Sequence, residues 1–229
     1  MPSLRLTMPA VFLLMAATGA AFSQGAPMQL PKGGAPAANA ISKVVPPPKV
    51  STQDGAAAIQ KANAWFNANA TMVGDFVQIA ADGKRTEGKL YVQKPGRLRF
   101  QYASPATIDI IADGTSVAIR DRKLATQDLA YLWQTPLKFL LKEKIDIARD
   151  TKVMDVSTTP TATTIVIEDK ATLGGTSRIK LVFDPQTYVL KQWMVTDPQG
   201  YDTLVSLFNL DFRQKPDPEL FHINMEKLN

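Results

Sequence analysis

Few residues in this chain could carry out chemistry on a substrate. Its 229 residues contain no cysteine and a single histidine, His222. This composition excludes a thiolate nucleophile, a disulfide and a cysteine-ligated metal. One histidine without a second histidine or a cysteine also gives no metal-ligand set and no triad motif. We therefore predict that His222 is a structural or exposed residue on a terminal strand.

Carboxylates are the remaining candidates for catalysis. Asp109, Asp113, Asp121 and Asp128 fall in one region of the chain, but Asp113 is explained by a turn at Asp-Gly-Thr. A glycosidase-like pair stays open as an alternative because its two carboxylates meet in space rather than in sequence, although no motif supports it. There is also no glycine-rich phosphate loop. We expect a protein that is not an enzyme and that uses no metal or cofactor.

The most informative stretch is residues 86–105, where two runs alternate in polarity on either side of Pro95-Gly96. Alternation with a period of two is typical of a strand that has one apolar and one solvated face. Pro-Gly favours a turn, so the stretch predicts a β-hairpin or a sharply bent strand pair. Its apolar face is formed by Leu90, Val92, Leu98, Phe100 and Tyr102.

Lys94 lies at the end of this apolar face. Two interpretations of the face remain open from the residues alone: it lines a site for an apolar ligand, or it is filled core. Lys94 likewise has either a role at that site or the ordinary position of a lysine that extends from a barrel rim.

The other elements surround this hairpin. A helical pattern with Asp54 as its cap covers residues 54–69, and a short helix with Thr135 as cap and Pro136 at its first position follows near 135–142. Residues 121–134 lose the alternation. Further strands are predicted from alternation and turn residues at 72–80, 108–112, 116–120, 152–158, 163–168, 177–183, 188–196 and 202–212.

These elements predict one mainly β domain, a half-open antiparallel β-barrel of about ten strands covered by a short α-helical lid. A large curved sheet has an apolar concave face that needs a cover. The helix at 54–69 and the segment at 135–142 are the available cover, and in the second segment we assign Pro136, Leu137, Leu140 and Leu141 to the lid.

The N-terminal region predicts export. We expect residues 1–23 to be a cleaved signal peptide, residues 24–53 to be a disordered Ala/Pro/Gly-rich linker, and residues 54–229 to form the domain. The expected location is the periplasm. The formal net charge is +5, or +4 without Arg5 of the signal, which fits an acidic partner or an anionic membrane surface. An exported protein rarely meets RNA, so we expect no nucleic-acid partner.

One pattern resembles a known family. Residues 88–102 read Gly-Lys-Leu-Tyr-Val-Gln-Lys-Pro-Gly-Arg-Leu-Arg-Phe-Gln-Tyr, ten residues after Phe-Val-Gln at 76–78. Ile-Ala-Asp-Gly at 111–114 and Thr-Pro-Leu at 135–137 follow in order. In order and spacing, these pieces resemble the outer-membrane lipoprotein carrier proteins, the LolA family, over roughly residues 55–225.

The resemblance implies an unclosed barrel with a helical lid that binds the acyl chains of lipoproteins. Such carriers take acylated lipoproteins from an ATP-driven inner-membrane exporter and pass them to an outer-membrane receptor, and we expect a monomer. Leu98 and Phe100 match inner-face positions of the family. Where the family has an inward-facing arginine that holds the lid, this chain has Lys94, which keeps the charge but lacks the planar fork of donors. The alternatives are an envelope-stress sensor of the same fold and a binder of apolar ligands that transports nothing.

Overall fold

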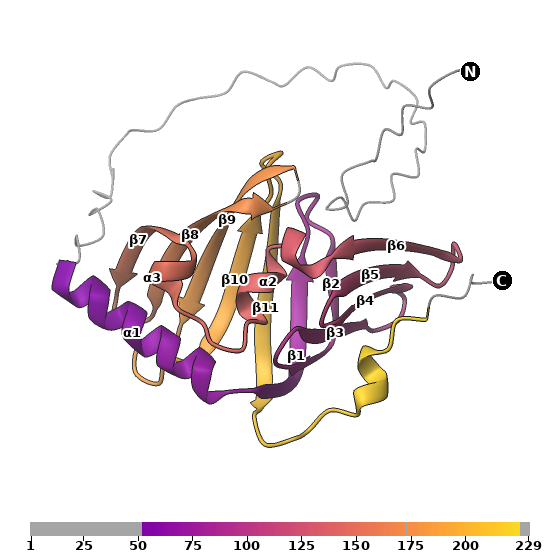
Figure 1. Ribbon diagram of the computed structural model, residues 1–229, viewed down its shortest axis with the longest axis horizontal. Helices are drawn as coiled ribbons and strands as arrows, with labels where there is room; N and C mark the ends of the chain where they lie inside the picture. The colour runs from indigo at the N-terminus through magenta and orange to yellow at the C-terminus, as the bar shows by residue number, and fades with distance from the viewer. Residues whose placement is uncertain (1–51, 173, 225–229) are drawn as a thin grey trace, which may run out of the picture.

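The computed structural model describes residues 52–172 and 174–224, which form a β-rich domain with a few short helices (Figure 1). The expected signal peptide lies outside the described residues, as does the expected linker up to residue 51. The helices are α1 (Thr52–Ala68), α2 (Leu137–Leu140), α3 (Ile147–Asp150) and the 3-10 turns η1 (Leu132–Gln134) and η2 (Pro218–Phe221). The strands are β1 (Thr71–Ile79), β2 (Arg85–Gln93), β3 (Arg97–Tyr102), β4 (Ile108–Asp113), β5 (Ser116–Asp121), β6 (Thr126–Tyr131), β7 (Lys152–Thr158), β8 (Thr163–Thr172), β9 (Gly175–Phe183), β10 (Leu190–Thr196) and β11 (Asp202–Asp211).

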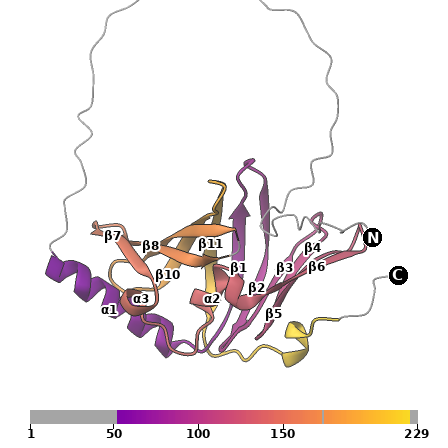
Figure 2. The same cartoon turned by 45° about the horizontal axis from the view of Figure 1, so that its top comes forward.

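All eleven strands belong to one antiparallel sheet with the order β6-β5-β4-β3-β2-β1-β11-β10-β9-β8-β7. Two meanders, β1 to β6 and β7 to β11, are joined where the first strand pairs with the last. The sheet curves strongly, and its edge strands β6 and β7 stand at opposite ends (Figures 1 and 2). The prediction of a half-open antiparallel barrel is therefore confirmed.

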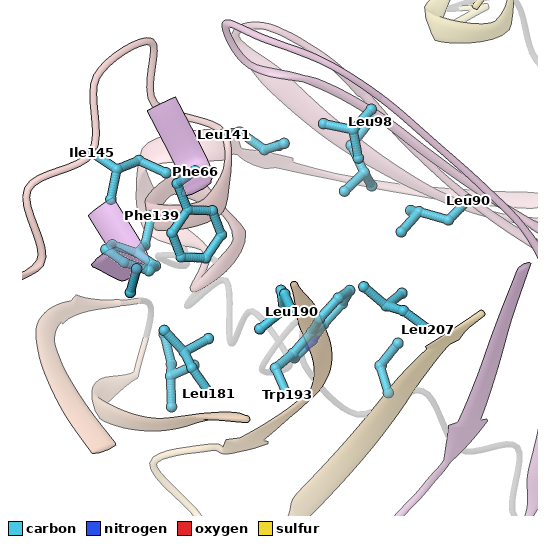
Figure 3. Close-up of a cluster of buried hydrophobic side chains, with 14 of the residues drawn as sticks. Phe66, Leu90, Leu98, Phe139, Leu141, Ile145, Leu181, Leu190, Trp193 and Leu207 are labelled. Carbon is cyan, nitrogen blue, oxygen red and sulfur yellow. The ribbon is translucent and has the colours of Figure 1, made fainter. Parts of the chain in front are cut away.

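The helices α1, α2 and α3 gather on one side of this sheet (Figures 1 and 2). Helix α1 turns Ala58, Ala62 and Phe66 inward, one helical turn apart from each other, as a helix with one apolar stripe does. Figure 3 shows side chains of the helical layer facing side chains of the strands in one buried cluster. The members labelled there are Phe66, Phe139, Leu141 and Ile145 from the helical layer and Leu90, Leu98, Leu181, Leu190, Trp193 and Leu207 from the sheet.

The turn between β2 and β3 is held against the next hairpin. Gly96 has a φ of 77°, in the left-handed region that favours glycine. A Cβ at this position would also lie 2.6 Å from the Cα of Gly114 in the β4–β5 turn. The chain therefore needs glycine here for both its conformation and its close packing, and this packing fixes the end of the β2–β3 hairpin next to the lid.

Four local predictions were wrong. Helix α1 begins at Thr52, so Asp54 lies within its first turn and is not its cap. Residues 126–131 form the edge strand β6, which the alternation did not reveal because Leu129 and Tyr131 are both exposed. Helix α2 begins at Leu137, and the hydroxyl of Thr135 donates to the Leu132 carbonyl at 2.8 Å instead of capping the helix. His222 follows the turn η2 and is exposed, not on a terminal strand.

Candidate functional site

An apolar cavity lies between the lid and the inner face of the sheet. Its lining residues come from the end of α1, from strands β1, β2, β3 and β10, and from the end of α2: Trp65, Phe66, Asn69, Met72, Leu90, Val92, Lys94, Leu98, Leu140, Leu141, Leu190 and Trp193. The space that the centre of a water molecule can occupy is about 30 Å³, which is room for one or two waters. The structure is thus a nearly filled, closed form.

The five residues predicted on the inner face of the hairpin are all buried, with 0–6% of their surface exposed. Leu90, Val92 and Leu98 line the cavity. Phe100 and Tyr102 lie outside its lining, in an aromatic cluster whose ring centroids are 4.9 Å and 5.0 Å from that of Phe76. The Tyr102 hydroxyl donates to Gln78 Oε1 at 2.8 Å, and burial raises the pKa of Tyr102 well above its usual value. In this closed form, Phe100 and Tyr102 belong to filled core.

Lys94 faces inward at the cavity wall. Its Nζ donates a hydrogen bond of 2.6 Å to the carbonyl of Phe66 and lies 5.5 Å from the centroid of the Phe66 ring. Burial lowers the pKa of Lys94 from 10.5 to about 8. The contact joins the β2–β3 hairpin to α1 and not to α2, the second lid segment.

The Lys94 contact also completes the end of α1. The last four carbonyls of a helix have no partner within it. Here the Phe66 carbonyl accepts from Lys94 Nζ, and the Trp65 carbonyl accepts from Asn69 Nδ2 at 2.7 Å. Both donors line the cavity. The polar groups at this site therefore serve the lid helix while the lid is closed.

The second lid segment meets the same hairpin turn through its backbone. The Gly96 N–H donates to the Leu141 carbonyl at 2.9 Å. Of the residues predicted for the lid, Leu140 and Leu141 line the cavity, Pro136 is buried outside the lining, and Leu137 begins α2. One turn of the β2–β3 hairpin thus contacts both lid segments.

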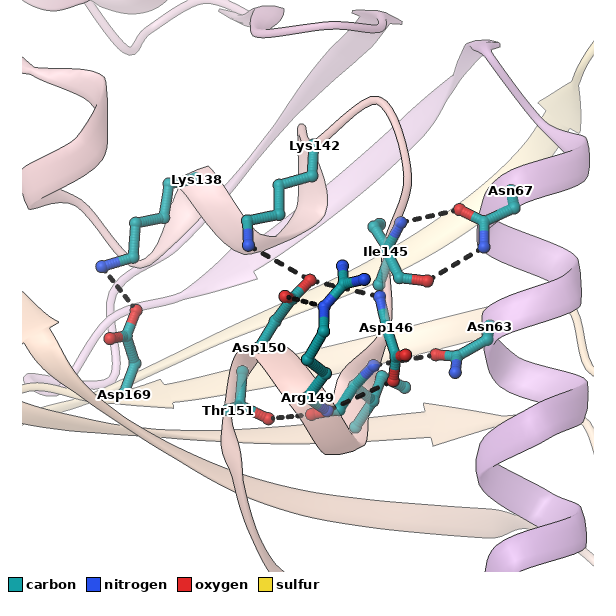
Figure 4. A network of polar contacts seen from close by, with 11 residues as sticks. Asn63, Asn67, Lys138, Lys142, Ile145, Asp146, Arg149, Asp150, Thr151 and Asp169 are labelled. Carbon is teal, nitrogen blue, oxygen red and sulfur yellow. Dashed lines mark hydrogen bonds and ion pairs between the residues drawn. The ribbon is translucent and has the colours of Figure 1, made fainter.

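Helix α1 is also tied to the segment that follows α2 and leads into α3 (Figure 4). Asn67 and the backbone of Ile145 exchange two hydrogen bonds, Nδ2 to the carbonyl at 2.9 Å and N–H to Oδ1 at 2.8 Å. Asn63, one helical turn earlier, accepts from the N–H of Ile147 at 3.0 Å. On the far side of α2, Lys138 Nζ lies 2.9 Å from Asp169 Oδ2 of β8. We call Asn63 and Asn67 the asparagine clamp.

Two residues of the cavity lining could not be predicted from the alternation of polarity along their strand. Leu190 and Trp193 of β10 both line it, although residues three apart on a regular strand point to opposite faces. An irregularity in the pairing with β9 between Leu190 and Gln192 brings both side chains to the inner face. Sequence reasoning based on a period of two could not find this pair.

The described residues provide no candidate metal site. None of their His, Asp and Glu side chains form a group of three or more that could hold a metal ion. Asp113 accepts from the backbone of Thr115 and Ser116 within its turn. Asp109 is buried, and its Oδ2 lies 2.6 Å from Nη1 of Arg122. Within residues 52–172 and 174–224, no helix is long and apolar enough to cross a membrane.

This chain is similar to several known proteins. The family model described as outer membrane lipoprotein carrier protein LolA matches residues 67–224. An outer-membrane lipoprotein carrier protein of Chromobacterium violaceum is 28% identical over 157 residues, 66% of this chain and 75% of that protein. One from Legionella pneumophila is 27% identical over 176 residues, 71% of this chain and 83% of that protein. Among solved structures, a LolA superfamily protein from Nitrosomonas europaea aligns with a TM-score of 0.42 at 9% identity, covering 74% of this chain and 97% of its own.

Proposed function

Because this chain belongs to the outer membrane lipoprotein carrier protein family, we propose that it carries acylated lipoproteins through the periplasm. It receives them from an ATP-driven exporter in the inner membrane and passes them to a receptor at the outer membrane. The chain acts as a monomer and catalyses no reaction. Its ligand is the acyl part of the lipoprotein.

The observation that carries this proposal is the apolar cavity beneath a lid that few polar contacts hold. Ten of its twelve lining residues are apolar or aromatic, and the other two are Asn69 and Lys94. Burial of an acyl chain stabilises a complex by about 0.8 kcal/mol per methylene group. A cavity of this chemistry is suited to alkyl chains and not to a polar substrate.

Binding requires the lid to open. The closed cavity has only about 30 Å³ of free space, so an acyl chain fits only after α1 and α2 move away from the sheet. Opening breaks the contact of Lys94 with the Phe66 carbonyl and the contact of Gly96 with the Leu141 carbonyl. The free energy of opening offsets part of the gain from burying the chains, and this allows the carrier to release its cargo.

The test is native mass spectrometry of the protein purified from its own periplasm, with lipid extraction, and a release assay with vesicles that contain lipoprotein, exporter and ATP. We expect an acylated species on the purified protein and ATP-dependent release of lipoprotein from the vesicles. A protein that carries no acyl species and releases no lipoprotein would contradict the proposal.

A pair of variants connects the assay to the cavity. The half-buried side chain of Leu140 lines the cavity from the lid. Leu140→Gln places a polar group there, so less of the acylated species should be recovered with the protein. The matched control is Leu124→Gln at the tip of the β5–β6 hairpin, where the leucine is 62% exposed. Equal recovery for the two variants would mean that the cavity is not the acyl site.

A further inference from the structure

Lys94 introduces a charge into a wall that is otherwise uncharged. The other polar residue of the cavity lining, Asn69, already donates to the Trp65 carbonyl. The Lys94 ammonium has the Phe66 carbonyl at 2.6 Å and the face of the Phe66 ring at 5.5 Å. Both partners belong to the lid helix α1, so both move away when the lid opens.

No carboxylate forms an ion pair with Lys94 in the part of the chain that the structure describes. Arg97 at the start of β3 and Asp113 at the end of β4 line a polar hollow together with residues 93–95. The carboxylate of Asp113 is engaged by two backbone N–H groups of its own turn. On the lid, Lys138 and Lys142 pair with Asp169 and Asp150. Lys94 is thus a cation without a counter-charge at the cavity.

Lid opening raises the free-energy cost of the Lys94 charge, because Lys94 then also loses its contact with the Phe66 carbonyl. A charged group that has lost its hydrogen-bond partner in apolar surroundings is strongly disfavoured. A ligand that brings a negative charge to the cavity wall would replace the Phe66 carbonyl and restore a partner to the ammonium. A neutral chain of the same length would not.

We propose that the opened cavity binds single-chain amphiphiles with an anionic head group, a carboxylate or a phosphate, whose head pairs with Lys94 Nζ. The chain lies against Leu90, Leu98 and Trp193. This inference rests on the proposed function, because it uses the same cavity and the same opening of the lid. It adds a preference for an anionic head group, which the neutral ester and amide groups of a lipoprotein acyl end do not use.

The charge of Lys94 at neutral pH supports the pairing with an anionic head group. Burial lowers the pKa of Lys94 to about 8, so most molecules carry the ammonium at neutral pH. A bound anion would raise this pKa again, since an opposite charge favours the protonated form. Arg97 and Asp113 carry opposite charges in the hollow, so the pair adds no net charge beside Lys94.

Tryptophan fluorescence can measure the binding directly. Two of the three tryptophans, Trp65 and Trp193, line the cavity, and the third, Trp133, is 61% exposed. In a Trp133→Phe background, the full chain is titrated with dodecanoate, dodecyl phosphate and dodecanol, each below the concentration at which it aggregates. We expect the anions to bind about tenfold more tightly than the alcohol, the size of one charged hydrogen bond.

Variants of Lys94 test the origin of this preference. Lys94→Gln keeps a donor one bond shorter but removes the charge, and it should abolish the preference for anions. Lys94→Arg should retain the preference. Lys89→Gln is the matched control, because Lys89 lies on β2, five residues before Lys94, and its Nζ pairs with Asp75 Oδ1 at 2.6 Å on the outer face. Far-UV circular dichroism shows that each variant is folded.

The outcomes separate this inference from the proposed function. Equal binding of anions and alcohol, or a preference that survives Lys94→Gln, overturns the inference and leaves the carrier function standing. Failure of all three amphiphiles to bind contradicts both. If either anion binds more tightly than the alcohol in a Lys94-dependent manner, the inference holds, and the ranking of the two anions distinguishes a fatty-acid head from a phospholipid-like head.

Discussion

At the scale of the residue, Lys94 is subject to two opposing effects. Burial disfavours its charged form, which lowers the pKa to about 8. The C-terminal end of α1, where the Phe66 carbonyl lies, favours a cation because of the helix dipole and the unpaired carbonyls. Lysine at this position therefore gives a lid contact that is present when the lid is closed but weak enough to break.

Replacing Lys94 with leucine tests this lid contact. Lys94→Leu removes the donor to the Phe66 carbonyl and replaces it with an apolar group of similar volume, so the fold should be retained. The closed form loses a stabilising contact while the acyl-bound form does not, so acylated cargo should remain on the carrier. The measurement is transfer of a labelled lipoprotein from the carrier to the receptor. Transfer at the wild-type rate would contradict a role for Lys94 in closing the lid, and Lys94→Arg serves as the control.

The lowered pKa of Lys94 also predicts a pH dependence of stability. Between about pH 8, where the folded residue loses its proton, and pH 10.5, where the unfolded residue does, the unfolded chain binds more protons at this position. The contribution of Lys94 to the free energy of unfolding therefore rises with pH across this window. The stability of the wild type relative to Lys94→Met, from urea unfolding below, within and above the window, should increase with pH. A difference that stays constant would show that Lys94 titrates normally in the fold.

At the scale of the element, the asparagine clamp makes the lid a single unit. The two hydrogen bonds between Asn67 and Ile145 resemble a pair of strand contacts, and Ile145 is only 2% exposed. Because Phe66 and Phe139 also pack with ring centroids 5.9 Å apart, the end of α1 and the segment that contains α2 and α3 are joined by both polar and apolar contacts. The lid should then open as one body.

Breaking the clamp should loosen the second lid segment selectively. Asn67→Ala leaves the buried N–H and carbonyl of Ile145 without these partners, which typically costs about 1–3 kcal/mol. Hydrogen exchange at the Ile145 amide should accelerate, and exchange in the central strands β1 and β11 should change little. Gln60→Ala on the exposed side of the same helix is the control. Unchanged exchange at Ile145 would mean that packing alone holds the segment.

Among the helices and strands, those with a local sequence pattern could be predicted from the sequence. Strands with one apolar face and short turns were found because alternation and turn residues are local signals, as in the hairpin around Pro95-Gly96. The edge strand β6 was missed because an edge strand with few buried residues carries no such signal. Contacts between Lys94 and Phe66, or between Asn67 and Ile145, join residues 28 and 78 positions apart, so no local pattern reveals them.

At the scale of the whole molecule, the proposed function requires an equilibrium between a form with a closed lid and a form with an open lid. The edge strands β6 and β7 do not close the barrel, so the lid can move without breaking the pairing of the sheet. Only about 30 Å³ is free beneath the closed lid. When only a minor open state binds, the apparent dissociation constant is the intrinsic constant divided by the fraction that is open. Under the proposed function, contacts that stabilise the closed lid therefore weaken acyl binding.

This relation predicts that a variant can be less stable and yet bind more tightly. Lys138 of α2 pairs at 2.9 Å with Asp169 of β8, whose side chain is 8% exposed. Asp169→Asn keeps the shape of the side chain but removes the charge, so the closed lid loses part of its attachment to the sheet. We expect a lower free energy of unfolding together with tighter binding of dodecanoate, by up to about tenfold if 1.4 kcal/mol of lid closure is lost.

The adjacent residue on the same strand provides the control. Glu168 pairs with Arg178 and Lys152, both on strands of the sheet, and has no such contact with the lid. Glu168→Gln should therefore lower stability slightly and leave the dissociation constant unchanged. If Asp169→Asn instead weakened binding in proportion to its loss of stability, the closed and binding-competent forms would be the same state, and the cavity would have to accept its ligand without movement of the lid.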